Sequence, residues 1–272
     1  MEIKYIDIHS HLNLPPLSEN KDAILAKMRE LGVATITVGT GLETSREAVA
    51  IAEENEGVCF ATVGIHPTDS DEEFDEQVFK DLAKKPCVVA IGETGLDYFR
   101  DQSDETKQKQ VELFKKHIEL AVTLNKPLML HVRASKGSDD AYYDALEILK
   151  TSPLTPPLQG EGNRTLKANF HFFSGSKECM EKIVDAGYTI SVDGPITFSH
   201  DYDDMIRAVP LEKIMIETDA PFAAPAPYRG KSCEPWMVVE VAKKIAELKN
   251  LDLEQVRVQL LENAKQFFAL DL

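Results

Sequence analysis

The sequence predicts an α/β fold in which eight parallel strands close into a (β/α)8 TIM barrel, as one domain spanning residues 1–272. Three observations support this prediction. Short β-rich runs alternate with longer helical segments, eight such runs fit within the 272 residues, and no Gly-x-Gly-x-x-Gly turn follows the first run. The structural alternative is a doubly wound open sheet, which more often has about five or six strands and carries such a turn.

The predicted strands are short and rich in valine, isoleucine, phenylalanine and threonine, which fit a buried pleated surface. Pro127 opens one of them, a position where the missing N–H is tolerated. The eight predicted strands are Ile3–His9, Val33–Gly39, Val58–Ile65, Cys87–Gly92, Pro127–Val132, Ala168–Phe173, Tyr188–Val192 and Lys213–Glu217.

Helical periodicity appears between most of these runs. In Lys107–Leu124, apolar residues recur at spacings of three and four, which marks one face of a helix. A capping box that begins at Thr44 predicts a helix N-terminus there. Gly32 stands where a helix would end in a left-handed residue. Two further helices are predicted after the eighth strand, over Pro235–Leu248 and Asp252–Phe268.

The segment Thr151–Arg164 departs from this alternation. It contains three prolines and two glycines and has no periodicity, which is typical of a surface loop. We interpret it as a flexible loop insertion in the barrel. A functional lid is the alternative interpretation.

Composition and charge narrow the classes of function. The formal net charge of −16 argues against tight, non-specific binding to DNA or to an anionic membrane, although bound cations can reverse the field locally. No apolar run approaches the ~18–20 residues that cross a bilayer, and the N-terminus does not resemble a signal peptide. We therefore expect a cytoplasmic protein with no membrane partner, whose four cysteines are free thiols.

Five of the seven histidines fall at or just after the end of a predicted strand. In a parallel barrel those strand ends share one mouth, where catalytic groups converge. A single histidine at a strand end is more often a polar residue with its hydrogen bonds satisfied. Five histidines at the ends of predicted strands instead predict a shared site. These histidines are His9, His11, His66, His131 and His171.

The types and positions of these residues indicate a metal site. His9 and His11 lie on the same face of one strand, which suits a metal ion of borderline softness. Glu93 could bridge two cations, and Asp219 could bind one of them or act as general base toward a bound water. We expect two divalent metal ions, with zinc favoured by the imidazoles and magnesium or manganese also accepted by the carboxylates. The predicted metal ligands are His9, His11, Glu93, His131, His171 and Asp219, and the predicted catalytic residues are Glu93 and Asp219.

Two more carboxylates lie on the strand faces that carry the predicted metal ligands, which would point into the barrel. Asp7 lies two residues before His9, and Glu217 lies two residues before Asp219. A charge that points into a barrel is costly unless a metal or a partner neutralises it. Asp7 and Glu217 could orient the ligand histidines, or they could form a buried hydrogen-bonded pair.

Six motifs resemble the TatD family of metal-dependent deoxyribonucleases, among the amidohydrolase-like barrels. A single piece such as HxH occurs in many hydrolases, whereas GETGLD followed by HxR, HxFSG and TDAP is specific. The matching segments run in the family's order across nearly the whole chain. They are DIHSHL (Asp7–Leu12), GIHP (Gly64–Pro67), GETGLDYFR (Gly92–Arg100), HVR (His131–Arg133), HFFSGS (His171–Ser176) and ETDAPF (Glu217–Phe222).

The resemblance implies the same metal ligands and adds three substrate-binding residues. His66 and Arg133 would lie near the scissile phosphate, and Arg229 would help to hold the substrate. Each has a simpler alternative: a structural hydrogen bond to a metal ligand for His66, a salt bridge at the mouth for Arg133, and a solvated loop charge for Arg229.

The sequence also departs from the family pattern. Ser232 and Cys233 replace an arginine and an asparagine, Thr68 stands where histidine is common, and Phe172 stands where cysteine is common. Losing an arginine removes a bidentate phosphate contact. Cys233 could be a nucleophile or a soft ligand, but no base is adjacent to it in sequence, which favours an ordinary thiol. Since none of these positions is a predicted metal ligand, they bear on the substrate rather than on hydrolysis.

The predicted site and the resemblance favour a phosphodiesterase that cleaves DNA from single-stranded or frayed ends. Binding should be weak and salt-sensitive, because the chain lacks a basic stripe. One alternative is an amidohydrolase-like enzyme that acts on a small-molecule ester, lactone or amide, and another is a non-enzymatic scaffold. The fold alone does not choose among them. No obligate protein partner is predicted.

Overall fold

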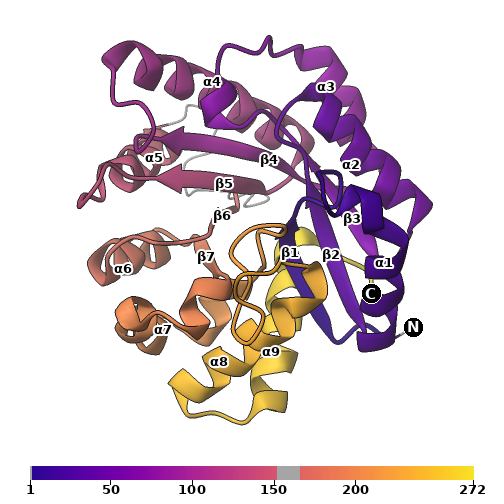
Figure 1. Cartoon of the computed structure of the whole chain (residues 1–272). Helices are drawn as coiled ribbons and strands as arrows, with labels where there is room; N and C mark the ends of the chain where they lie inside the picture. Colours follow the sequence, from indigo (N-terminus) through magenta and orange to yellow (C-terminus); the bar gives the residue numbers. More distant parts are fainter. Residues whose placement is uncertain (1, 152–165) are drawn as a thin grey trace, which may run out of the picture.

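Eight parallel strands form a single sheet in chain order, from β1 to β8 (Figure 1). The structure is a computed structural model that describes residues 2–151 and 166–272. Each strand pairs with the next in parallel register, so the predicted (β/α)8 barrel is confirmed. The strands are β1 (Tyr5–Ser10), β2 (Val33–Val38), β3 (Cys59–Val63), β4 (Val88–Asp97), β5 (Leu128–Arg133), β6 (Ala168–His171), β7 (Thr189–Val192) and β8 (Ile214–Ile216).

The barrel closes between β1 and the segment that follows β8. The backbone N–H of His11 donates to the carbonyl of Ala220 at 2.8 Å, and the N–H of Asp219 donates to the carbonyl of His9 at 2.9 Å. An isolated parallel bridge joins Ser10 to Ala220. These contacts lie just beyond the carboxyl end of β8, so closure of the barrel itself brings Asp219 beside the histidines of β1.

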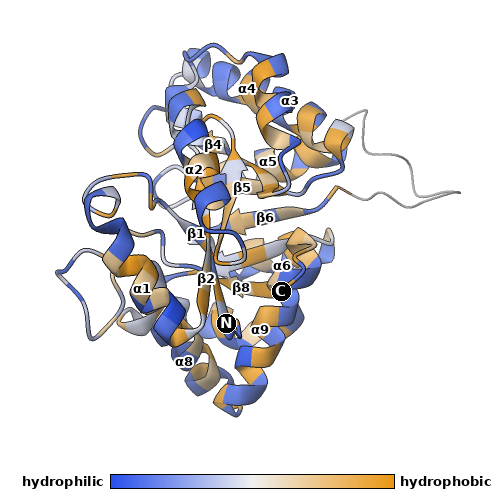
Figure 2. Ribbon diagram, turned by 90° about the vertical axis from the view of Figure 1, so that its right-hand side faces the viewer, coloured by the Kyte–Doolittle hydropathy of each residue, from blue (hydrophilic) through white to orange (hydrophobic). Residues whose placement is uncertain are grey.

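The helices lie outside the sheet (Figure 1), and apolar and polar residues alternate along them (Figure 2). Each long helix buries apolar residues, for example Ile24, Leu25 and Met28 on the helix over Lys21–Leu31. Burial of such residues is the main source of stability for these helices. None of the described helices is both long enough and apolar enough to cross a membrane. The helices are α1 (Lys21–Leu31), α2 (Leu42–Glu54), α3 (Glu76–Ala83), α4 (Asp104–Leu124), α5 (Asp140–Thr151), α6 (Lys177–Asp185), α7 (Asp203–Ala208), α8 (Val238–Lys249) and α9 (Leu253–Phe268).

Strand β4 is longer than predicted, and the prediction that it ends at Gly92 is wrong. All ten of its residues are buried, and its two glycines permit close contact with β5. A Cβ atom at Gly92 would lie 2.3 Å from the carbonyl oxygen of Met129, and one at Gly95 would lie 2.1 Å from that of His131. Both glycines have positive φ angles, of 146° and 139°. The glycines of this segment, which suggested that the strand ends at Gly92, therefore allow β4 to continue past that residue.

The capping box predicted at Thr44 is also wrong. Helix α2 begins at Leu42, two residues earlier, and the Leu42 N–H donates to Glu72 Oε1 at 2.7 Å. Thr44 instead accepts a hydrogen bond from the N–H of Thr40 at 2.9 Å. A carboxylate distant in sequence satisfies the helix N-terminus, which local sequence could not reveal.

The predicted loop insertion at Thr151–Arg164 falls almost wholly outside the described residues. Thr151 is the last residue of α5, and residues 152–164 are not described.

His117 of α4 is a buried histidine that supports the fold. Its Nε2 accepts a hydrogen bond from the N–H of Ile65 at 3.0 Å, and its Nδ1 donates to the carbonyl of Leu113 at 2.9 Å. Burial lowers the pKa of His117 to about 4. The neutral ring therefore fixes the backbone next to His66, just after β3.

Protonation of His117 should destabilise the fold. The unfolded side chain titrates near pH ~6.5, so the stabilisation from the neutral ring is complete above that pH and is lost as the pH falls toward about 4. Between pH 7 and pH 5 the wild type should lose about 2 kcal/mol more unfolding free energy than His117→Gln. Urea unfolding of both proteins at both pH values, with a chelator present, measures this difference. Equal losses in the two proteins would contradict it.

Candidate active site

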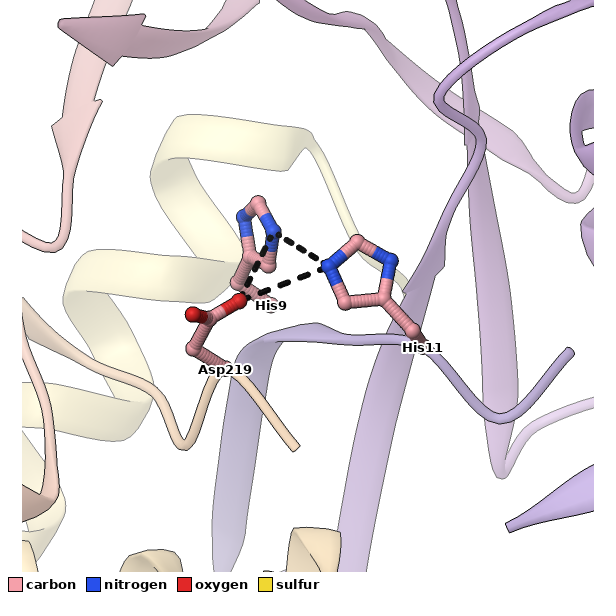
Figure 3. Close-up of side chains that lie close together, drawn as sticks. All are labelled: His9, His11 and Asp219. Atoms are coloured by element: carbon pink, nitrogen blue, oxygen red, sulfur yellow. Dashed lines mark hydrogen bonds and ion pairs between the residues drawn. The ribbon is translucent and has the colours of Figure 1, made fainter. Parts of the chain in front are cut away.

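The first group of ligand-type atoms joins the end of β1 to the segment after β8 (Figure 3). His9 Nε2 and His11 Nε2 lie 3.3 Å apart. Asp219 Oδ1 lies 3.6 Å from the His9 nitrogen and 3.4 Å from the His11 nitrogen. The three side chains could hold one metal ion. The predicted inward face of β1 therefore carries the side chains that meet Asp219.

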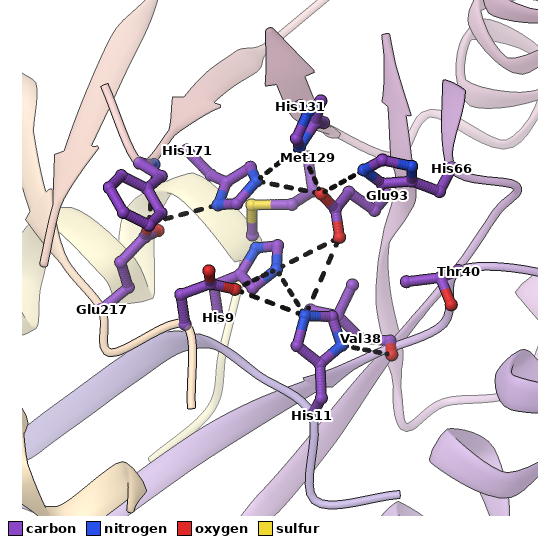
Figure 4. Close-up of polar contacts among 12 residues, drawn as sticks. His9, His11, Val38, Thr40, His66, Glu93, Met129, His131, His171 and Glu217 are labelled. Atoms are coloured by element: carbon purple, nitrogen blue, oxygen red, sulfur yellow. Dashed lines mark hydrogen bonds and ion pairs between the residues drawn. The ribbon is translucent and has the colours of Figure 1, made fainter. Parts of the chain in front are cut away.

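The second group surrounds Glu93 of β4 (Figure 4). Glu93 Oε1 lies 2.9 Å from His131 Nδ1, 3.0 Å from His171 Nε2 and 3.5 Å from His66 Nε2. The other carboxylate oxygen, Oε2, lies 3.3 Å from His9 Nε2. One carboxylate thus presents one oxygen to each group, which is the arrangement expected of a bridging ligand.

These spacings fit divalent cations. A tetrahedral ion with bonds of about 2.0–2.1 Å separates its ligand atoms by roughly 3.3 Å, close to the spacing of the nitrogens of His9 and His11. Ring nitrogens that face each other need a proton or a cation between them. The Nδ1 atom of His9 is also buried with no hydrogen-bond partner in the described part of the chain. The donor set of imidazole nitrogens and carboxylate oxygens therefore suits a metal of borderline softness.

The ionisable side chains of the site are buried, and the charge of each one shifts the pKa values of the others. Burial alone would raise the pKa of Glu93, but His171, His9 and His66 hold it well below its usual value. Burial lowers the pKa of His9. At His171 burial is outweighed by Glu93 and Glu217, which raise its pKa well above the usual value. At Asp219 burial is outweighed by the histidines of β1, which lower its pKa. The histidines therefore favour the ionised forms of Glu93 and Asp219.

Hydrogen bonds orient the ligand rings from behind. Glu217 Oε1 lies 3.2 Å from His171 Nδ1, as expected for a carboxylate that fixes a ligand histidine. Asp97 Oδ2 lies 3.1 Å from His131 Nε2, and the carbonyl of Val38 lies 3.4 Å from His11 Nδ1. Each ring thus presents its other nitrogen to the site.

Asp7 contacts backbone N–H groups and threonine hydroxyls rather than a ligand ring. Its carboxylate accepts hydrogen bonds from the N–H of His9 at 3.3 Å and from the N–H and hydroxyl of Thr218 at 2.9 and 2.8 Å. Burial raises the pKa of Asp7 well above its usual value. Asp7 therefore fastens β1 to the segment that carries Asp219, and it makes no pair with Glu217.

His66 faces the second group through one nitrogen. Its Nδ1 accepts the N–H of Thr68 at 3.1 Å, so a neutral ring carries its proton on Nε2, the atom that faces Glu93. Burial lowers the pKa of His66 to about 3, which keeps the ring neutral. In this state His66 is a hydrogen-bond donor toward the site.

A cavity of about 490 Å³ opens above the two groups. Arg133 lies on its wall, and its guanidinium stacks 3.9 Å from the centre of the Phe99 ring. Arg229 lies outside the cavity lining and stacks 3.9 Å from the centre of the Phe198 ring. Neither arginine pairs with an acidic side chain of the described residues, so the salt bridge considered for Arg133 does not form within them.

Two residues of the site, Asp97 and Arg100, are not among those predicted from the sequence. Asp97 lies four residues after Glu93, on the same face of β4, but the strand was predicted to end before it. Arg100 lines the cavity, and its side chain is 67% exposed. Cys233 is buried, its Sγ lies 3.9 Å from the carbonyl of Thr218, and burial raises its pKa. These features match an ordinary thiol rather than a nucleophile.

Comparisons with known proteins assign the chain to a family. The family model described as "TatD related DNase" matches residues 6–269. The chain is 34% identical to the uncharacterized metal-dependent hydrolase YcfH of Escherichia coli (strain K12), over 98% of this chain and 96% of that protein. It is 33% identical to the uncharacterized metal-dependent hydrolase YabD of Bacillus subtilis (strain 168), over 97% and 99%. The crystal structure of YJJV, a TatD homolog from Escherichia coli K12, matches with a TM-score of 0.86 and 28% identity over 100% of both chains. The chain belongs to the TatD-related DNase family.

Proposed function

We propose that this metal-dependent hydrolase cleaves phosphodiester bonds of DNA from single-stranded or frayed ends. The observation that carries the proposal is the position of Arg133. Its guanidinium has no acidic partner in the described structure, lies over the ring of Phe99, and Arg133 lines the same cavity as Glu93. A planar cation kept free of carboxylates beside a metal site suits a phosphate group.

Two divalent metal ions complete the proposed site, with zinc as the expected metal. His9, His11 and Asp219 would hold one, and His131 and His171 would hold the other. Glu93 would contact both through its two oxygens. Such ions, when bound, lower the pKa of water and neutralise charge on a phosphate.

The chain's own residues supply the remaining steps. Asp219 is the proposed general base, because its side chain is 14% exposed toward the cavity while that of Glu93 is 4% exposed. It would take the proton of the attacking water. His66 would donate from Nε2 to a phosphate oxygen, and Arg133 with Arg100 would hold the phosphate from the rim of the cavity.

The net negative charge of the protein favours weak binding of DNA. The chain carries a net charge of −16, so attraction to DNA must come from the few arginines at the mouth and from the cations. Single-stranded ends can enter a cavity of about 490 Å³, whereas a duplex is too wide. Affinity should therefore fall as salt concentration rises.

The proposed substrate class is tested with a panel. Single-stranded DNA and a set of small esters, lactones and amides are offered to the protein loaded with zinc, manganese or magnesium. We expect degradation of the DNA and no turnover of the other compounds. Turnover of the ester, lactone or amide set alone would refute the nuclease proposal and leave a hydrolase of small molecules.

Replacing Glu93 with Gln keeps the shape of the side chain and removes its charge. Loss of second-shell contacts alone costs about 10–100-fold in such sites, so loss of the bridging carboxylate should lower turnover at least about 100-fold. Elemental analysis after dialysis should find about two ions per chain in the wild type and fewer in the variant. Glu254→Gln, on the exposed side of α9, is the matched control. Wild-type turnover by Glu93→Gln, or by native protein in metal-free buffer, would contradict the proposed role of Glu93 as a ligand shared by two metal ions.

Replacing Arg133 with Ala should lower kcat/KM for single-stranded DNA by roughly 10–100-fold, the range of a charge-assisted hydrogen bond. The slope of log kcat/KM against log salt should become shallower by about 0.7. Arg29→Ala removes the same charge at the C-terminal end of α1, where Arg29 contacts Asn55, and should change neither quantity. Equal effects of the two substitutions on kcat/KM would mean that only the net charge of the protein matters, which would contradict a specific role for Arg133.

A further inference from the structure

A few aromatic side chains are exposed on the surface. The described residues include four exposed aromatics: Phe99, Tyr143, Phe198 and Phe222. A cation covers a ring face in three of them, namely Arg133 on Phe99, Lys182 on Tyr143 and Arg229 on Phe198. Phe222 has no such cation, and it is 54% exposed.

Phe222 is also the exposed aromatic that lines the cavity. Its ring centre lies 6.3 Å from that of His11, with the planes inclined at 68°. The Phe222 ring therefore lies beside the group formed by His9, His11 and Asp219, and one face of the ring is left uncovered. An exposed ring on the wall of a cavity can contact a ligand that enters it.

The backbone holds Phe222 in place. Its N–H donates to the carbonyl of Asp219 at 2.9 Å, and the N–H of Cys233 donates to the carbonyl of Pro221 at 3.0 Å. The same segment is joined to β1 through Ala220 and His11. The backbone that carries the ring thus keeps a fixed position relative to the proposed metal ligands, as a specificity element requires.

We infer that Phe222 is a stacking platform for the unpaired nucleobase next to the scissile phosphate. This inference rests on the proposed nuclease function. A base lies one sugar away from its phosphate, so a phosphate held at the metal groups places a base at the rim of the cavity. Inside a duplex both faces of a base are covered by its neighbours, and stacking on Phe222 therefore favours single-stranded or frayed ends. Because every base has a π-face, the contact does not select sequence.

The test compares two strands of equal length and charge: single-stranded DNA, and a strand of abasic tetrahydrofuran residues. Stacking on an aromatic side chain changes affinity by roughly five- to 100-fold. The wild type should prefer the DNA strand by such a factor in kcat/KM, with most of the difference in KM. Phe222→Ala should lose this preference, Phe222→Trp should keep it, and Phe222→Leu, which is apolar but has no π-face, should lose most of it.

Tyr143→Ala is the control, since Tyr143 is exposed on α5 and does not line the cavity; it should retain the wild-type preference. A wild type without preference for the DNA strand, or a Phe222→Ala protein that keeps the preference, would overturn the inference while leaving the nuclease proposal intact. A wild type that cleaves neither strand would overturn the nuclease proposal and this inference with it.

Discussion

The structure depends on one constraint: the Glu93 carboxylate lies buried between two sets of imidazoles. Its two oxygens contact His9 on one side and His131 and His171 on the other. Charged and polar groups of this density are tolerable in a protein interior only when each meets an opposite charge, a hydrogen bond or a metal. Closure of the barrel supplies this arrangement, because it brings the ends of β1, β4, β5 and β6 and the segment after β8 to one mouth.

Much of this could be predicted from sequence, because periodicity and strand ends are local signals. Alternation along Asp7–His11 predicts which side chains share a face, and the structure brings His9 and His11 together with Asp219. The contacts that sequence reasoning missed are long-range. Glu72 caps α2 from a distant loop, and Asp97 orients His131 only because the glycines of β4 let the strand continue past Gly92.

The barrel and the residues at its mouth have separate roles. The buried site defines the metal chemistry, while exposed side chains on the loops determine what reaches it. Arg133 lies over the ring of Phe99 and has no acidic partner among the described residues, in a chain with a net charge of −16. For the proposed DNA substrate, we expect the local charge at the mouth to matter more than the net charge of the whole protein.

The most direct measurement of the central claim is anomalous X-ray diffraction from crystals grown with zinc or manganese. The account predicts two anomalous peaks, one on each side of the Glu93 carboxylate. One would lie among His9, His11 and Asp219, and the other would lie beside His131 and His171. A single peak, or peaks that do not contact Glu93, would contradict the claim that this carboxylate joins two metal sites.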